Sequence, residues 1–572
     1  MPGPKISDNS LQEWEDAGTT FANALDKYLC SCLALRSKPL SDVTFLKLLA
    51  TRIDSALDSF NATLDHQISQ AKATLALTRN KILSPTYHLP EEVLTEIFSH
   101  VVYIRPDPDQ PVPMADSLVQ IYRSLYNLIG VCSAWKNAAL ARGSFWSTIP
   151  IVSSNPSHPR LRCPQAMQLS LDRAGSADLH LAAMLPHWPR NHPALDAITK
   201  HASQFRTLNI SSSCYCVVSD ILSIFGGLGS SSRISELHVQ RKREKSSRET
   251  LPSKFDYIIE ATSSDRAGFD QLLARLSVFR LCGAPIHWDQ VAFSNQLVEL
   301  ELQEFTMGFD LEIDKMLTAL SSATELRHLK FISIITFPAH DESDTSDSKI
   351  AFPKLQTLLV RDLYVNTLDR LLSSVASCAH QVTLQLTEKA FRHVHPGAPE
   401  SPECDTNDLF QLLSRLPVTT LLIDGEKDNN WMSAEDFREL ITSLPDLETL
   451  GINFWVFDDN LCEALSRPSN NDSSPFPHIK NIHFISAKVW DFEPFTAMVA
   501  SHSGILERME LRVNVRVHAG TGSDGDSISD WGSVDEDDYF PSCLQDIVPD
   551  LQLELTEYDG DSKEFRSPEW QL

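Results

Sequence analysis

The strongest constraint on the fold of this chain is a short apolar pattern that recurs between residues 205 and 511. Each copy has the form apolar-x-x-apolar-x-apolar. Side chains two residues apart lie on the same face of a β-strand, so each copy predicts a short strand with one buried face. The copies are Phe205/Leu208/Ile210, Ile234/Leu237/Val239, Leu276/Phe279/Leu281, Leu297/Leu300/Leu302, Leu326/Leu329/Phe331, Leu355/Leu358/Val360, Val418/Leu421/Ile423, Leu447/Leu450/Ile452, Ile479/Ile482/Phe484 and Leu506/Met509/Leu511, with a weaker copy at Leu384/Leu386.

The spacing of the copies is stronger evidence than their number, because chance alone yields on the order of ten such triplets here. Copies that start at Leu297, Leu326 and Leu355 follow one another every 29 residues. Residues 160–515 therefore resemble irregular leucine-rich repeats, whose period is about 20–29 residues. A gap of 42 residues between Ile234 and Leu276 departs from that period. The resemblance implies an α/β solenoid, in which each strand-helix unit buries its apolar face against its neighbours.

Helix starts are predicted between some of these copies. Asn366 precedes an apolar helical stretch and has Asp369 three residues later, and Ser433 has Asp436 at the same distance. This spacing is typical of a side chain that caps the first turn of a helix. We therefore predict helices that begin at these two positions.

A second pattern lies upstream of the array. Leu89–Phe98 reads LPEEVLTEIF and Val131–Trp135 reads VCSAW. A proline suits the first turn of a helix, and the apolar residues after it fall on one helical face. The two segments resemble an F-box, and their flanks, Ile82–Pro85 and Gly143–Ile149, resemble those of a large fungal group of F-box proteins.

This resemblance implies a three-helix module over residues 82–150 that binds the Skp-type adaptor of a cullin-RING ubiquitin ligase. The residues that it places against the adaptor are Leu89, Pro90, Val93, Leu94, Ile97, Phe98, Val131, Trp135 and Trp146. An ordinary core helix followed by a proline-rich loop would explain either segment alone, but the ordered pair is harder to obtain by chance. Four prolines between Arg105 and Asp116 predict a stiff, extended connection between the two segments.

Residues 1–81 form a predicted N-terminal helical region. Within it, residues 41–81 carry apolar side chains every three or four residues and contain neither proline nor glycine, which indicates one long helix. Two interpretations stay open. The stripe packs on the neighbouring domain, which its width favours, or it forms a short coiled coil through which the chain dimerises weakly.

The chain carries 76 acidic and 49 basic residues and a net charge of −27, which argues against broad binding to nucleic acid or anionic lipid. Its 11 cysteines include two C-x-C pairs, Cys30/Cys32 and Cys214/Cys216, without a second ligand pair, so we expect reduced, mostly buried thiols and no metal. Neither a signal peptide nor a membrane-spanning run is recognisable. We expect a cytoplasmic or nuclear protein, and the basic run Gln240–Lys245 is either a nuclear localisation signal or a solvated loop.

Residues 516–572 form an acidic C-terminal tail. Its Gly-, Ser- and Asp-rich part between Thr521 and Asp538 predicts disorder. The alternation of Leu551, Leu553 and Leu555 predicts a strand that caps the array.

No hydrolase, zinc-protease or nucleotide-binding motif occurs in the sequence. We therefore expect no catalytic residue and no cofactor. The expected function is substrate recognition in an SCF-type (Skp-cullin-F-box) ligase, with the F-box on the adaptor, cullin and RING subunits joined through it, and the array on a target protein. The alternatives are a non-ligase interaction scaffold built from the same modules and an enzyme without a recognisable motif.

Overall fold

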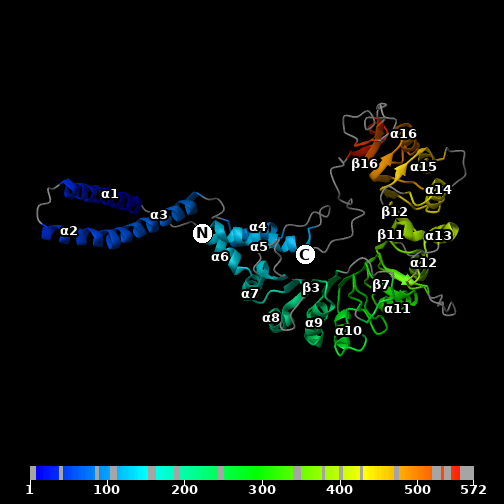
Figure 1. Ribbon diagram of the computed structural model, residues 1–572, viewed down its shortest axis with the longest axis horizontal. Coiled ribbons are helices and arrows are strands. Elements are labelled where there is room, and N and C mark those ends of the chain that lie inside the picture. The colour runs from blue at the N-terminus through cyan, green and yellow to red at the C-terminus, as the bar shows by residue number, and fades with distance from the viewer. Residues whose placement is uncertain are drawn as a thin grey trace. The chain divides into compact units, whose positions relative to one another are not determined.

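The computed structural model of the chain divides into two compact units, Met1–Pro90 and Glu91–Leu572 (Figure 1). The residues that the structure describes are 8–37, 43–83, 89–103, 112–152, 163–185, 193–242, 250–254, 256–338, 349–376, 380–397, 403–425, 430–468, 476–517, 530–533 and 543–553.

The first unit consists of two long helical segments. α1 (Asp8–Ser37) is the first, and α2 (Val43–Ser55), the π-helical turn η1 (Ala56–Asn61) and α3 (Ala62–Leu83) follow one another without a break as the second. The second segment coincides with the helix expected at residues 41–81. The segments meet where Tyr28 packs on Phe60, with 5.4 Å between the ring centroids. Every described side chain of this unit is exposed or half-buried, so the two segments enclose no core.

Three helices open the second unit, namely α4 (Glu91–Val102), α5 (Met114–Val131) and α6 (Ser133–Ala141), and the short turn η3 (Gly143–Trp146) follows them. Pro113 is extended as expected, with φ −53° and ψ 145°, but α5 begins directly after it, so Met114–Asp116 at the end of the stretch are helical. Residues 105–111 of that stretch lie outside the described residues. The side chains that form the core of this module are Leu94, Phe98, Leu118, Leu125, Ala139, Phe145 and Trp146.

The strands of the second unit are β1 (Thr148–Val152), β2 (Leu179–Met184), β3 (Phe205–Ser212), β4 (Glu236–Arg241), β5 (Val278–Cys282), β6 (Glu299–Gln303), β7 (Thr306–Phe309), β8 (His328–Ile332), β9 (Ile335–Phe337), β10 (Thr357–Arg361), β11 (Gln381–Leu386), β12 (Val418–Asp424), β13 (Thr449–Asn453), β14 (Val456–Phe457), β15 (Asn481–Val489), β16 (Arg508–Val517), β17 (Asp530–Ser533) and β18 (Asp550–Leu553). Most of them form one sheet in the order β1-β2-β3-β4-β5-β6-β8-β10-β11-β12-β13-β15-β16-β17, with β14 beside β15 and β18 beside β16, and β7 and β9 form a separate two-stranded sheet. Every neighbouring pair in this order is parallel except β16 and β17.

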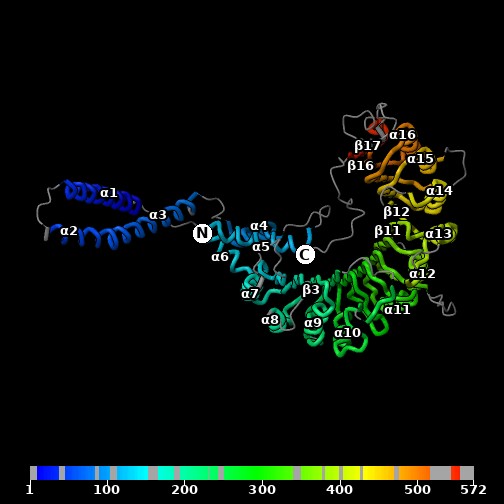
Figure 2. The backbone as a smooth tube through the Cα atoms, in the orientation of Figure 1, coloured from blue at the N-terminus to red at the C-terminus, as the bar shows by residue number. Residues whose placement is uncertain are grey.

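Helices cover one side of this sheet, and the strands line the other side, which is the inner side of the array in Figure 2. The helical elements are α7 (Cys163–Ala174), α8 (Pro193–His201), η4 (Ala202–Gln204), α9 (Tyr215–Gly226), η5 (Gly229–Ser231), α10 (Arg266–Leu273), α11 (Leu311–Leu320), α12 (Val365–Ser374), η8 (Glu388–Phe391), α13 (Thr406–Leu413), α14 (Ala434–Thr442), α15 (Asp459–Leu465) and α16 (Phe492–Ser501). Parallel strands need a crossover connection. A helix supplies it for most neighbouring pairs, although the connection from β5 to β6 contains none.

The strand register brings the predicted apolar triplets opposite one another. Leu300 of β6 lies between Phe279 of β5 and Leu329 of β8, and Leu329 lies opposite Leu358 of β10. All four are buried, so they form a continuous apolar ladder between the sheet and the helices. The expected leucine-rich-repeat-like α/β solenoid is confirmed. The array begins earlier than residue 160, because β1 already pairs with β2.

A left-handed turn follows several strands at the same position. Gly283, Glu304, Ser333, Asp362 and Phe454 each come directly after a strand, and their φ angles are 76°, 57°, 49°, 54° and 55°. In each case the backbone N–H donates to a carbonyl oxygen of the neighbouring strand of the sheet, as from Glu304 to Ile332 over 2.8 Å. A Cβ atom at residue 283 would lie 1.9 Å from the carbonyl oxygen of Arg241, so only glycine fits there.

The last strands extend the sheet beyond the repeats. β18 pairs parallel with β16, and its Leu551 lies opposite Met509. β17 pairs antiparallel with β16, although it lies in the stretch for which composition predicts disorder. The expectation is therefore wrong for Asp530–Ser533, and the rest of Thr521–Asp538 lies outside the described residues.

The basic run Gln240–Lys245, for which a solvated loop was one interpretation, begins inside β4, because Gln240 and Arg241 belong to that strand.

Candidate interaction surfaces

Helix α4 carries apolar side chains on two faces. Leu94, Phe98 and Val102 are buried in the module. Val93, Ile97 and Val101 follow one another at four-residue spacing and therefore share a face, and their exposed fractions are 43%, 43% and 40%. Val131, the last residue of α5, is 58% exposed. We call Val93, Ile97, Val101 and Val131 the exposed apolar set.

The nine residues singled out by the F-box resemblance divide into two groups. Pro90, Val93, Ile97 and Val131 are exposed, Leu89 and Trp135 are half-buried, and Leu94, Phe98 and Trp146 are buried. The buried three support the surface from beneath and are not accessible. Trp146 is held within the fold by a hydrogen bond of 3.0 Å from its Nε1 to the carbonyl oxygen of Ala139. Val101 was missed in the sequence, although its four-residue spacing from Ile97 is a signal that could have found it.

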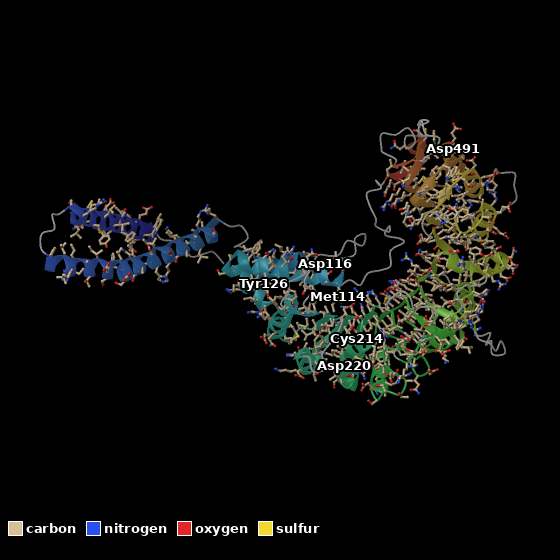
Figure 3. The ribbon with its side chains drawn as sticks, viewed as in Figure 1. Met114, Asp116, Tyr126, Cys214, Asp220 and Asp491 are labelled. Carbon is tan, nitrogen blue, oxygen red and sulfur yellow. The ribbon has the colours of Figure 1, made fainter. Side chains whose placement is uncertain are left out.

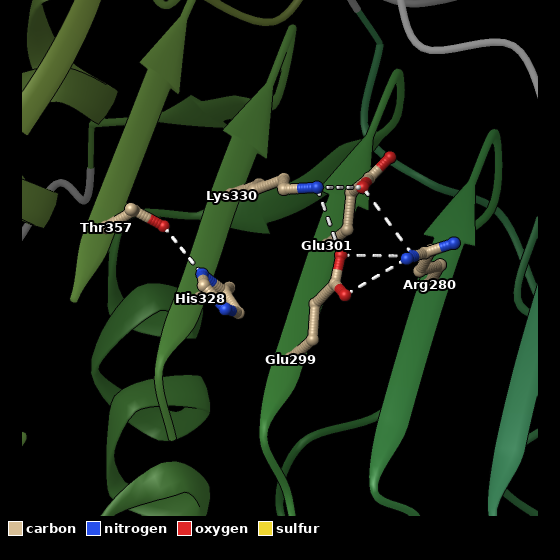
Figure 4. A network of polar contacts seen from close by, with 6 residues as sticks. All are labelled: Arg280, Glu299, Glu301, His328, Lys330 and Thr357. Carbon is tan, nitrogen blue, oxygen red and sulfur yellow. Dashed lines mark hydrogen bonds and ion pairs between the residues drawn. The ribbon is translucent and has the colours of Figure 1, made fainter. Parts of the chain in front are cut away.

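A charged cluster lies on the inner strand face, at alternate positions between the buried leucines (Figure 4). The Arg280 guanidinium of β5 donates two hydrogen bonds, of 3.1 and 3.0 Å, to the Glu299 carboxylate of β6. The Lys330 ammonium of β8 donates to Glu299 over 3.0 Å and to Glu301 over 3.2 Å. We call Arg280, Glu299, Glu301 and Lys330 the inner charge cluster.

Two members of the inner charge cluster, Glu299 and Lys330, are held in their charged forms. Burial alone would raise the pKa of Glu299, but the hydrogen bonds and charges of Arg280 and Lys330 outweigh burial and hold this pKa at about 2. Burial would likewise lower the pKa of Lys330, and the two carboxylates raise it instead. The cluster therefore presents fixed charges of both signs to any molecule on the inner strand face.

Polar groups of the neighbouring strands flank the cluster. His238 of β4 lies beside Arg280 in the register, and burial together with that positive charge lowers its pKa to about 3, so its imidazole is neutral near pH 7. On the other side, His328 Nδ1 lies 2.9 Å from Thr357 Oγ1 (Figure 4). Arg361 is buried at the end of β10.

A second polar group of the inner face lies on later strands. Asp424 at the end of β12 accepts hydrogen bonds from Gln385 Nε2 over 3.1 Å and from Asn453 Nδ2 over 2.9 Å. Both amide side chains are buried. The residues involved lie far apart in the sequence, and nothing in the local pattern predicted this contact.

The described residues contain no group of three or more His, Cys, Asp or Glu side chains that could hold a metal ion. The described cysteines are free thiols, but the expectation that they are mostly buried is wrong. Among them only Cys282 and Cys462 are buried, Cys30, Cys32 and Cys216 are exposed, and the others, such as Cys214 (labelled in Figure 3), are half-buried. Within the described residues, no helix has the length and apolarity to cross a membrane.

Comparisons with known proteins add little to this description. No protein-family model matches the chain, and no curated protein matches it. Among solved structures, a yeast Rad7 and Elc1 complex matches with 12% identity and a TM-score of 0.31 over 86% of this chain and 99% of that one. The leucine-rich repeat-containing protein LegL7 from Legionella pneumophila matches with 10% identity and a TM-score of 0.27 over 64% of this chain and 97% of that one. A TLR13–ssRNA13 complex matches with 13% identity and a TM-score of 0.26 over 64% of this chain and 48% of that one.

Proposed function

We propose that this chain is the substrate-recognition subunit of an SCF-type ubiquitin ligase. Residues 82–150 act as an F-box and bind a Skp-type adaptor, through which cullin and RING subunits join. The inner strand face of the repeat array binds a target protein. The observation that carries the proposal is the second apolar face of α4, which lies within the segment of F-box resemblance and is exposed.

A helix that is apolar on two faces is expected to be covered on both sides. α4 covers one face within its own module and leaves Val93, Ile97 and Val101 exposed. Protein interfaces of standard size have a few apolar anchors that dominate the binding energy. The exposed apolar set supplies such anchors, and the buried Phe98 and Trp146 hold the helix that carries them.

The target side of the proposal rests on the inner strand face. The surface of a parallel solenoid is suited to partners because its strands present side chains at regular intervals on one side. The inner charge cluster adds fixed charges at defined positions, which set specificity more than affinity. We infer that the target carries polar or charged groups that match this cluster.

In this proposal the chain is not an enzyme. It raises the effective concentration of target lysines near the ligase's catalytic subunits, and bond chemistry takes place elsewhere. Such a role suits the cytoplasm or the nucleus.

The adaptor interface is tested by binding of a purified Skp-type adaptor, measured by calorimetry. Ile97→Glu and Val131→Glu each place a charge in the exposed apolar set without touching the core. Each is expected to weaken binding about 30-fold or more, because an anchor residue contributes about 2 kcal/mol or more. Leu251→Glu is the matched control, because Leu251 has the same exposed fraction as Ile97, 43%, and lies outside the module.

Equal binding by the wild type and both variants would remove the proposed interface. If the adaptor binds but a cullin does not join the complex, the chain is a non-ligase scaffold.

The target is sought by affinity purification with and without proteasome inhibition. A Glu301→Ala/Lys330→Ala double variant removes both members of one ion pair, so neither of these two charges remains without the other. Targets that need the inner charge cluster should no longer co-purify with this variant.

A further inference from the structure

The first unit leaves an unusually large apolar surface uncovered. None of the side chains whose burial the structure describes in residues 8–37 and 43–83 is buried. Seventeen large apolar side chains are exposed there, namely Leu11, Trp14, Phe21, Leu25, Tyr28, Leu29, Leu33, Leu35, Phe45, Leu48, Ile53, Leu57, Phe60, Leu75, Leu77, Ile82 and Leu83. We call these residues the N-terminal stripe. In contrast, the far longer second unit exposes nine within its described residues.

Apolar residues in part of the stripe recur at the spacing typical of a contact line between two packed helices, which we call the seam. Trp14, Phe21, Tyr28 and Leu35 follow one another every seven residues along α1, and Leu11 and Leu25 are separated by twice seven. Apolar residues at two positions of a seven-residue repeat are typical of helices that pack side by side in a coiled coil or bundle. The contact of Tyr28 with Phe60 uses this seam between α1 and the second helical segment, but one such contact leaves most of the seam exposed.

The size of the stripe matches a stable interface. An aromatic side chain offers about 150–250 Å² of surface, and five aromatic residues of the stripe are about half exposed. They alone provide about 500 Å² on each copy, and the twelve aliphatic residues add more than the further 300 Å² or so that a standard interface needs per partner.

The net charge of the first unit favours a second copy of this chain as the partner of the stripe. Residues 1–90 contain nine acidic and nine basic residues and are therefore neutral, so the whole net charge of −27 belongs to residues 91–572. Two copies of such a chain repel one another through their second units. The neutral first unit is the part through which like copies can associate without that cost, and a pair of antiparallel helices from each copy has the composition of a four-helix bundle.

We propose that the N-terminal stripe is the interface between two copies of this chain, which join their first units in a four-helix bundle. This inference is independent of the proposed adaptor and target contacts. In the dimer, two repeat arrays belong to one complex, so a target with two binding sites is held more firmly than by a single array.

The test uses the full chain and two double variants of α1. Phe21→Glu/Leu25→Glu charges the stripe, and Gln12→Glu/Asn23→Glu adds the same charge at exposed polar positions of the same helix. The molar mass is measured by size-exclusion chromatography with light scattering over a range of concentrations. The wild type and the Gln12/Asn23 variant are expected at twice 64.0 kDa and the Phe21/Leu25 variant at 64.0 kDa.

A second set of measurements distinguishes loss of the interface from loss of helical structure in the variant. Two differently tagged full chains are mixed, and co-purification of one tag with the other reports on association, while circular dichroism reports on helix content. A wild type that stays at 64.0 kDa at all concentrations overturns the proposal. So does a Phe21/Leu25 variant that dimerises like the wild type. Binding of the monomeric wild type to lipid vesicles or to another protein through the stripe would overturn it in favour of that occupant.

Discussion

The indole ring of Trp135 in α6 packs against the ring of Phe98 in α4, with 5.0 Å between the ring centroids and an angle of 57° between the ring planes. Phe98 is fully buried and also contacts Phe145, with 6.4 Å between the centroids. Trp135 thus joins two helices of the module, whether or not a partner contacts it. A loss of adaptor binding on its removal would have two causes that a binding experiment cannot separate.

Trp135→Ala is expected to lower the free energy of unfolding by about 3 kcal/mol, because an aromatic side chain that packs between helices is lost. Ile97→Glu is expected to change it by about 0.5 kcal/mol or less, since surface substitutions seldom cost more. Chemical denaturation followed by tryptophan fluorescence or circular dichroism measures both values. Similar values for the two variants would contradict the division into supporting and surface residues.

Two adjacent leucines of β10 test the two faces of the sheet. Leu358 is buried in the apolar ladder, and Leu359 is half-buried on the inner strand face. Leu358→Ala is expected to cost about 2–5 kcal/mol of unfolding free energy, because it leaves a cavity between sheet and helices. Leu359→Ala should cost clearly less, as it opens to solvent. Equal losses in denaturant titrations would show that the inner face is covered as well.

His238 makes the stability of the array depend on pH. Its pKa in the folded chain is about 3, whereas an unfolded histidine has a pKa of about 6.5. As the pH falls below about 6.5, His238 binds a proton in the unfolded chain but not in the folded chain, so stability is lost between pH 6.5 and 3. From pH 7 to pH 5 the loss from this residue is about 2 kcal/mol.

His238→Gln keeps a polar side chain between Asn209 and Arg280 but does not titrate. Its free energy of unfolding is expected to fall less than that of the wild type between pH 7 and pH 5, by about the same 2 kcal/mol. Denaturant titrations at the two pH values give the difference. Parallel losses in both proteins would show that His238 is protonated in the folded chain.

The repeated left-handed turn predicts opposite effects at two equivalent positions. Gly283→Ala places a Cβ atom against the Arg241 carbonyl oxygen and is expected to lower the thermal midpoint strongly. Glu304→Gly is expected to lower it little or to raise it, because glycine adopts the φ of 57° at this position without strain. Thermal unfolding of the two variants decides this, and a tolerated alanine at 283 would show that the turn can move.

Local patterns predicted those features that depend on neighbours in the sequence. The apolar triplets predicted the strands because side chains of a buried strand face recur every two residues. Ser433 was predicted as a helix cap, and its Oγ accepts a hydrogen bond of 3.1 Å from the backbone N–H of Asp436. Both predictions need only residues that lie within a few positions of one another.

Predictions failed where the partner is distant. Asn366 was expected to cap a helix, but α12 begins before it, and the side chain is buried within the first turn. Its Nδ2 donates to Asp310 Oδ1 over 3.1 Å and to the Thr336 carbonyl oxygen over 2.7 Å. These partners belong to the two preceding repeats, so the role of Asn366 is visible only once the repeats are stacked.

The amino-acid sequence alone determined most strands of the array from β3 onward, the long helix after residue 43 and the apolar character of α4, because periodicity and side-chain type are local properties. Tertiary structure decided which apolar side chains remain exposed. Val93 and Phe98 belong to the same apolar helix, yet one is exposed and the other is buried, because α6 and η3 pack against a single face of α4. It also decided that Arg280, Glu299 and Lys330 share one surface, because strand register, which depends on the lengths of the intervening loops, places them side by side.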